Sequence, residues 1–196
     1  ASLFLVKNIF SLLMSLFSLM FMIIYPLAPS QVSLIGMFTI GIPAFVMSLE
    51  SNKSRIQGHF LSNVLFRALP AGLTDFAVIS SLVIFCNEFQ VQEKDVSTAC
   101  TIVMAIVGIM ILYRIASPMT KIHWVLWFAM IGGIWFGITS LKQIFAITML
   151  SRKSAMLMII FAIVAEPLLR YLSLIVQKLW EIPGWLKRKM RKGELP

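Results

Sequence analysis

The chain has 196 residues, of which 59% are hydrophobic and 13% are charged, and its mean hydropathy is +0.91. Soluble domains average roughly 45–50% apolar and about 25% charged residues, so this composition excludes a water-soluble globular protein. The net charge of +9 does not indicate nucleic-acid binding, because no soluble basic domain is present to hold DNA or RNA. We predict an all-α membrane protein whose partner is the lipid bilayer and not a nucleic acid.

Six apolar stretches are each about as long as one bilayer crossing. A membrane helix needs ~20 mainly apolar residues, and within lipid the backbone must satisfy its own hydrogen bonds. The stretches do not alternate in polarity, which argues against a β-barrel. The predicted helices cover residues 3–25, 31–49, 69–89, 96–115, 122–139 and 155–176. They form a six-transmembrane-helix bundle over residues 1–178, followed by a basic aromatic tail over 179–196.

Lysine and arginine are distributed unevenly between the two sets of connecting segments. Membrane proteins keep an excess of these cations on the cytoplasmic side. With both termini in the cytoplasm, 13 of the 17 cations fall inside and 4 fall outside. The outer four are Lys94, Lys142, Arg152 and Lys153. We therefore predict a multi-pass protein with both termini cytoplasmic.

The tail combines Trp180 and Trp185 with a cluster of lysine and arginine. Pro183-Gly184 is expected to break the helix as it leaves the bilayer. Tryptophan prefers the membrane interface, and each cation near an anionic surface gains ~1 kcal/mol. We expect the tail to lie on the inner leaflet, and a solvated positive stop signal is the alternative.

No sequence motif for catalysis or metal binding is present. The chain lacks a glycine-rich phosphate loop, H-E-x-x-H, G-x-S-x-G and the phosphorylation sequence D-K-T-G. Cys86 and Cys100 have no C-x-x-C spacing and are interpreted as small apolar packing residues. We expect no catalytic residue, no metal site and no cofactor in this chain, and no ATP hydrolysis by it alone.

The second predicted helix carries glycine and proline near its middle, at Gly36, Thr39, Gly41 and Pro43. Pro43 removes the amide that would bond to the carbonyl of Thr39, and glycines allow helices to approach closely. Interrupted helices near mid-membrane are where transporters coordinate ions. The segment is a candidate transport site, and ordinary helix packing around a proline kink is the alternative.

Two acidic residues fall inside predicted helices, where charge is costly. Glu166 lies about 11 residues into the sixth helix, or ~17 Å along its axis, and Pro167 follows it. Glu166 is a secondary transport-site candidate, and an ion pair with Arg170 four residues later is the alternative. Asp75 lies near the inner end of the third helix and is interpreted as an interfacial or helix-capping residue.

Two stretches near the N-terminus together resemble a known family. Residues 5–11 are L-V-K-N-I-F-S, and residues 38–45 are F-T-I-G-I-P-A-F, with Glu50 following. With a hydrophobic hairpin between them, they resemble the start of the C-terminal membrane domain of P-type ATPases. In that family a cytoplasmic phosphorylation domain enters the fifth membrane helix through a stalk bearing lysine, here Lys7, and six helices follow.

The resemblance implies a bacterial plasma-membrane pump for a cation. A part outside this chain would supply the phosphorylated Asp, the site for ATP and Mg, and four N-terminal membrane helices. The chain begins Ala1-Ser2 without Met, and we expect it to be a piece of a longer or processed protein. The transported cation, the cytoplasmic domains and the N-terminal helices would be its partners.

The sequence departs from the family at two positions. Calcium and sodium/potassium pumps have an N-x-x-T-D-x-x-P-like pattern in the sixth membrane helix. Aligned on Pro43, this chain has Gly36 at the Asn, Thr39 at the Thr and Ile40 at the Asp. Because the two strongest cation ligands are missing, the transported ion is not assigned.

A free-standing polytopic membrane protein is the alternative to a piece of an ATPase. It would be a secondary transporter or a membrane-anchoring subunit. An upstream D-K-T-G and a T-G-D-G-x-N-D-like sequence in the parent gene would favour the ATPase and would make the parent an enzyme.

Overall fold

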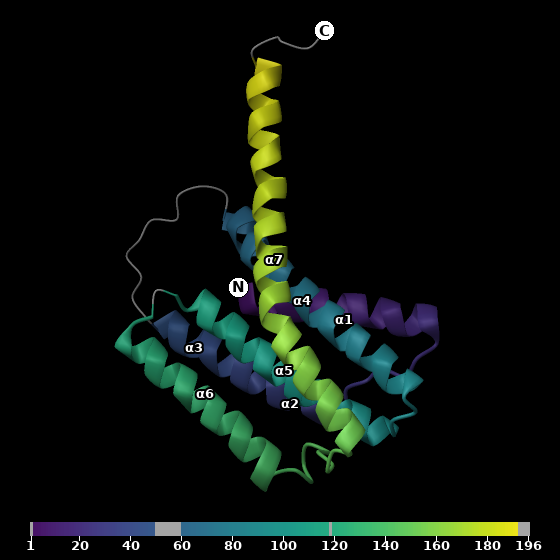
Figure 1. Cartoon of the computed structure of the whole chain (residues 1–196). Helices are drawn as coiled ribbons and strands as arrows, with labels where there is room; N and C mark the ends of the chain where they lie inside the picture. The colour runs from purple at the N-terminus through teal and green to yellow at the C-terminus, as the bar shows by residue number, and fades with distance from the viewer. Residues whose placement is uncertain (1, 50–59, 118, 192–196) are drawn as a thin grey trace.

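The computed structural model describes residues 2–49, 60–117 and 119–191, and every regular element in these ranges is a helix (Figure 1). The elements are α1 (Ser2–Phe21), α2 (Pro29–Gly36), the π-helix η1 (Met37–Gly41), α3 (Ile42–Leu49), α4 (Phe60–Glu88), α5 (Glu93–Ile115), α6 (Lys121–Ser140) and α7 (Arg152–Arg191). Since α2, η1 and α3 run without interruption from Pro29 to Leu49, they form one crossing, which we call the second span.

Six helical stretches in the described part of the chain are long and apolar enough to cross a membrane. This confirms the predicted all-α, six-helix architecture. α1 ends at Phe21, four residues before the predicted end, and the next residue, Met22, has a positive φ of 52°. α4 begins at Phe60, well before the expected start of the third crossing. The orientation of the termini relative to a membrane stays a prediction.

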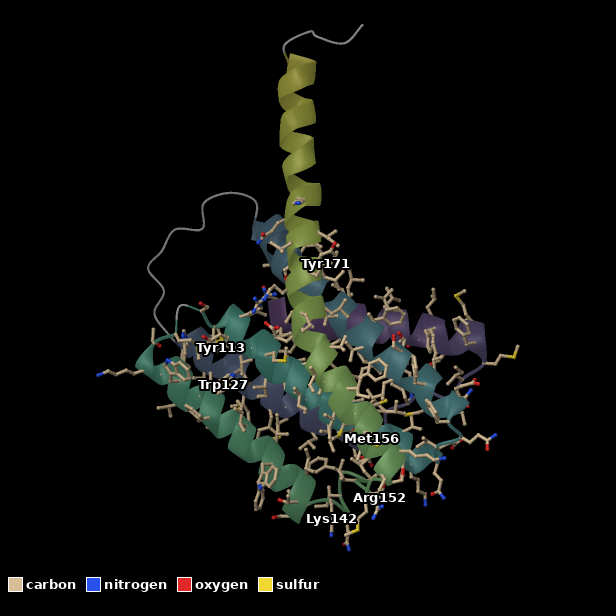
Figure 2. The ribbon with its side chains drawn as sticks, in the orientation of Figure 1. Tyr113, Trp127, Lys142, Arg152, Met156 and Tyr171 are labelled. Atoms are coloured by element: carbon tan, nitrogen blue, oxygen red, sulfur yellow. The ribbon has the colours of Figure 1, made fainter. Side chains whose placement is uncertain are left out.

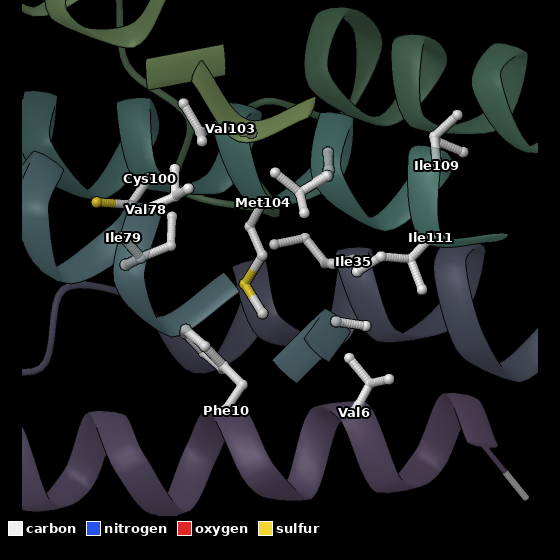
Figure 3. Close-up of a cluster of buried hydrophobic side chains, with 14 of the residues drawn as sticks. Val6, Phe10, Ile35, Val78, Ile79, Cys100, Val103, Met104, Ile109 and Ile111 are labelled. Carbon is white, nitrogen blue, oxygen red and sulfur yellow. The ribbon is translucent and has the colours of Figure 1, made fainter. Parts of the chain in front are cut away.

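α4 and α5 are the most buried crossings and form the centre of the bundle. α1 packs on α4, α7 packs on both α4 and α5, and α6 packs on α5 and the second span. Side chains from α1, α2, α4 and α5 meet in the core shown in Figure 3, among them Phe10, Ile35, Ile79 and Met104. Cys86 and Cys100 are buried and free, which confirms that they are packing residues and not a disulfide.

Three glycines let the second span approach α5 and α6 closely. A Cβ on Gly108 would lie 2.7 Å from Thr39 Cγ2, and a Cβ on Gly133 would lie 2.2 Å from Phe38 Cε1. A Cβ on Gly137 would lie 2.6 Å from Leu34 Cδ1. Each glycine therefore receives one side chain of the second span, and no larger residue fits without a shift of that side chain. Gly133 and Gly137 are thus packing residues.

The loop between α6 and α7 folds back over the ends of α2 and α5, although much of it is apolar. Asp95 Oδ2 accepts hydrogen bonds from Ser151 N at 3.1 Å and Ser154 Oγ at 3.3 Å. The buried amide of Gln31 donates to Ala146 O at 3.2 Å, and Ala146 has a positive φ of 51°. Polar side chains at one end of the bundle therefore fix the start of α7. Figure 2 shows Lys142 and Arg152 at this end.

α7 is 40 residues long and continues through both Pro167 and Pro183. The expected helix break at Pro183-Gly184 is wrong, since the backbone stays helical to Arg191. The last turns of α7 stand clear of the other helices (Figure 1). The position of this tail relative to the inner leaflet stays a prediction, and residues 192–196 lie outside the described part of the chain.

Gly133 and its neighbour Gly132 provide a matched test of this close packing. A Cβ on Gly132 would meet nothing within 4 Å, so Gly132→Ala should be neutral or slightly stabilising through helix propensity. Gly133→Ala pushes against the Phe38 ring and should destabilise the chain by about 1–3 kcal/mol. The measurement is thermal unfolding of both variants in the same lipid. Equal stability of the two variants would contradict the packing described here, and Phe38→Leu should restore Gly133→Ala.

Candidate transport site

The residues predicted from the second span are brought together by a π-helical turn. Gly36 precedes η1, Thr39 and Ile40 lie within it, and Pro43 follows as the second residue of α3. Ile42 N donates to Met37 O, five residues back rather than four. π-helical turns are rare and occur frequently at functional sites. The sequence predicts a kink here but not this register, and Gly36 and Pro43 are the signals nearest to it.

The π-helical register changes which carbonyl faces the missing amide of Pro43. In an α-helix that carbonyl would be Thr39 O, four residues earlier. Because the chain enters Pro43 in the five-residue register, the carbonyl opposite Pro43 is that of Phe38. The candidate backbone ligand therefore moves by one residue toward the N-terminus.

Thr39 is 3% exposed, and its hydroxyl group already has a partner. Thr39 Oγ1 donates to Ile35 O at 2.7 Å, while its methyl group packs on Gly108. The hydroxyl oxygen can still accept through its lone pairs, so it can face a cation without losing this bond. Ile40 is buried and offers only its backbone oxygen.

A positive charge lies beside Gly36. A Cβ on Gly36 would lie 3.6 Å from Lys7 Nζ of α1. At an effective dielectric constant of 20, two like unit charges 4 Å apart repel by ~4 kcal/mol. Gly36 therefore does not fit a direct cation contact in this conformation, and Phe38 to Pro43 is the more favourable part of the turn. The sequence indicates Lys7 only as a stalk residue and does not predict this contact.

Glu166 lies apart from the π-helical turn, on α7. Its Oε1 accepts a hydrogen bond from Arg170 Nη2 at 2.6 Å, and both side chains are more than half exposed in this chain. The pair borders a cavity of about 420 Å³ formed with residues of α5 and α6, including Arg114 and Trp127. Figure 2 shows Trp127 beside Tyr113. The structure thus forms the ion pair that is the alternative to a transport role, and that role stays a prediction.

A larger cavity of about 930 Å³ lies at the end of the bundle where α1 meets α2 and α6 meets α7. Its lining includes Tyr25, Glu93, Lys94 and Lys142. Burial raises the pKa of Tyr25 above its usual value of 10.0, and a hydrogen bond to Ser11 partly opposes this. The cavity is lined by both acidic and basic side chains, and the π-helical turn is not part of its lining.

The described residues contain no group of three or more His, Cys, Asp or Glu side chains that would hold a metal ion. Calcium takes six to eight oxygen ligands, more than the carbonyl and hydroxyl oxygens of this one turn. A cation bound beside η1 therefore needs oxygen ligands from elsewhere, and within the described part of the chain the arrangement has no nucleophile or base placed for catalysis.

Asp75 differs from its sequence interpretation as an interfacial or capping residue. It lies inside α4, is 4% exposed, and has a carboxyl oxygen, Oδ1, that is buried without a hydrogen-bond partner among the described residues. The capping interpretation is wrong because Asp75 lies well inside α4, which begins at Phe60, and its depth in a membrane stays a prediction. The sequence feature that indicates this buried carboxyl group is an acidic residue within an otherwise apolar stretch.

Comparison with curated proteins identifies relatives of one kind. The chain is 27% identical over 128 residues to a probable cation-transporting ATPase of Streptococcus pneumoniae, covering 61% of this chain and 16% of that protein. It is 33% identical over 100 residues to the calcium-transporting ATPase CtpE of Mycolicibacterium smegmatis, covering 49% and 13%. Its homologues are cation-transporting P-type ATPases.

The CtpE of Mycobacterium bovis is 30% identical over 134 residues, which is 60% of this chain and 17% of the relative. The similarity to P-type ATPases therefore spans about a sixth of each relative's length. No protein-family profile matches the chain, and no solved structure matches it. The resemblance seen in the first 50 residues is confirmed at this level, and the chain is a multi-pass membrane protein related to P-type ATPases.

The Glu166–Arg170 pair predicts a specific pattern of mutant stability. Glu166→Gln leaves an unpaired guanidinium near the middle of a crossing, where a charge costs ~2.5–3.5 kcal/mol on insertion scales. We expect Glu166→Gln to lower the unfolding temperature in lipid bilayers, and the added change Arg170→Gln to restore most of it. A double variant no more stable than Glu166→Gln alone would exclude the ion pair as the reason for the loss.

Proposed function

We propose that this chain is the membrane-embedded C-terminal part of a P-type ATPase that transports a cation across the bacterial plasma membrane. The observation that carries the proposal is the similarity to cation-transporting ATPases from several bacteria. Six apolar helices and the absence of a phosphorylation sequence from this chain fit a membrane part whose ATP-hydrolysing part lies elsewhere.

The π-helical turn of the second span is the proposed point of contact with the cation. Carbonyl oxygens near Phe38 and Pro43, with the Thr39 hydroxyl, are the oxygen ligands that this chain offers. The N-terminal membrane helices of the parent protein would complete the coordination, since hard cations take several oxygen ligands. Ca²⁺ is the first ion to test because two of the relatives are named as calcium-transporting ATPases.

ATP and Mg²⁺ would act in the cytoplasmic domains of the parent protein. ATP bound there would supply the phosphoryl group that drives transport, and Mg²⁺ would bind with it. This chain contributes the helices that the phosphorylation domain moves. α1 is the first of these and is joined to the second span, so a displacement of α1 reaches η1 through the contact between Lys7 and Gly36.

The proposal is tested on the protein that contains this chain, purified whole and placed in liposomes. ATP-driven uptake of a cation, with Ca²⁺ tested first, is expected, and replacing the aspartate of an upstream D-K-T-G by asparagine should abolish it. A complete gene product that has no such domain and moves ions down a gradient would overturn the proposal in favour of a secondary transporter.

Pro43→Ala tests the role of the π-helical turn in transport. Alanine supplies the amide that proline lacks, so the turn can return to an ordinary α-helix and its free carbonyl becomes bonded. We expect cation-stimulated ATP hydrolysis by the intact protein to fall roughly tenfold or more, the effect of losing about 1.4 kcal/mol of interaction. Gly132→Ala, which meets no neighbour, is the control. Unchanged activity of Pro43→Ala at normal expression would remove the turn from the mechanism.

A further inference from the structure

Asp75 is the one acidic residue on a stripe of α4 that is otherwise apolar and buried. The residues at i−7, i−4, i+4, i+7 and i+11 from Asp75 are Ala68, Ala71, Ile79, Leu82 and Cys86, each at most 3% exposed. Residues at this spacing share one face of a helix. Asp75 therefore points into the bundle with the core and not toward lipid or water, and α4 itself is one of the two most buried crossings.

Among the described residues, no charged side chain pairs with the Asp75 carboxyl group and stabilises it as an anion. Oδ1 is buried without a hydrogen bond among the described residues. The hydroxyl of neighbouring Thr74 is used elsewhere, because Thr74 Oγ1 donates to Pro70 O at 2.7 Å. Burying a polar group without a partner costs several kcal/mol, and an isolated ionised carboxylate costs far more.

Several charged groups on the helices that pack against α4 have other contacts among the described residues. On α1, Lys7 Nζ lies beside Gly36. On α5, Asp95 accepts from Ser151 and Ser154, while Arg114 donates to Leu169 O and Ser173 Oγ. On α7, Glu166 pairs with Arg170. Among the side chains that the structure describes, the remaining charged groups on α5 and α7 are exposed, and they are Glu93, Lys94, Arg152, Lys153 and Lys178. The thiols Cys86 and Cys100 are buried.

We propose that Asp75 is a proton-binding site inside the membrane domain and that its proton is exchanged during transport. A proton needs one oxygen, which this apolar stripe supplies. A metal cation needs several oxygens, and the described residues contain no group of three or more His, Cys, Asp or Glu side chains that would supply them. In this conformation the carboxyl group is protonated. On exchange its O–H bond breaks, the proton passes to water, and a carboxylate is left.

The contact between α1 and α4 indicates how water would reach Asp75. Gly72, one turn before Asp75, packs against α1 so closely that a Cβ would lie 2.8 Å from Ile9 Cγ2 and 3.2 Å from Val6 O. One turn further, the rings of Phe76 and Phe17 meet edge to face at 6.1 Å. Displacement of α1 separates both contacts and opens this side of α4. The exchange step rests on the proposed function, because the ATPase cycle would drive that displacement.

Infrared spectroscopy of the 196-residue chain in lipid nanodiscs tests the protonated state without requiring transport. Asp75→Asn replaces a neutral acid by a neutral amide of similar size, so it should fold and should remove one carboxylic-acid C=O band seen in the wild-type chain at neutral pH. Glu88→Gln, at the exposed end of the same helix, should leave that band in place. A wild-type spectrum from which Asp75→Asn removes no such band would overturn the proposal.

If Asp75→Asn does not fold, dicyclohexylcarbodiimide labelling of the wild-type chain provides the second measurement. The reagent adds across a protonated carboxyl group in an apolar site, giving an N-acylurea that carries the mass of both reactants. An adduct on the peptide containing Asp75 supports the proposal. Absence of that adduct, when the same peptide is labelled in unfolded chain at acidic pH, overturns it.

Proton exchange is tested on the intact protein in liposomes with a pH-sensitive dye. Proton movement opposite to cation uptake is expected in the wild type, and Asp75→Asn should lose it while keeping phosphoenzyme formation from ATP. Unchanged proton movement in Asp75→Asn would overturn the exchange step. A wild-type protein without ATP-driven cation uptake would instead refute the proposed function, and the infrared result would still decide whether Asp75 holds a proton.

Discussion

The close approach of the second span to α5 and α6 is the contact that joins α6 and the π-helical turn to the α4–α5 centre of the bundle. In lipid there is no hydrophobic drive to bring helices together, so van der Waals packing between small and large residues holds them. Here Leu34, Phe38 and Thr39 fit against Gly137, Gly133 and Gly108. The spacing on the two sides matches, because Leu34 and Phe38 are one turn apart and so are Gly133 and Gly137.

This contact also places the π-helical turn inside the bundle. Thr39, which packs on Gly108, is part of η1. A wider turn with irregular hydrogen bonding is tolerated in a membrane only where protein surrounds it. The same glycine contacts that hold the second span therefore keep its irregular backbone away from lipid, and they bring polar oxygens into the interior without adding a charge.

The sequence predicts the helices well because hydropathy and length determine a membrane crossing almost alone. Where the predictions differ from the structure, the reason is a tertiary contact. Asp75 is buried because its face of α4 lies in the core with Ile79 and Leu82, and hydropathy along one helix does not indicate that contact.

The residues of the candidate site also divide into those that local spacing predicts and those that only contacts between helices bring together. Gly36, Thr39, Ile40 and Pro43 could be grouped from their spacing on one helix, and they do lie together around η1. The ion pair of Glu166 with Arg170 was available from the i, i+4 spacing. The approach of Lys7 to Gly36 joins two different helices, and no local pattern in either helix contains it. The π-helical register depends on packing around the turn, so propensity alone does not predict it.

Because α7 is unbroken, it carries its C-terminal residues away from the end of the sixth apolar stretch. The apolar stretch predicted for the sixth crossing ends near residue 176 and α7 continues to Arg191, which adds 15 residues, or ~22 Å at 1.5 Å per residue. Electrostatic attraction to headgroups falls off over a Debye length of about 8 Å at physiological ionic strength. The backbone of the final turns is thus carried more than two Debye lengths along the helix axis from the end of the crossing. For a helix that stands along the bilayer normal, the backbone beyond the first two turns of this extension lies outside the range of the lipid charge.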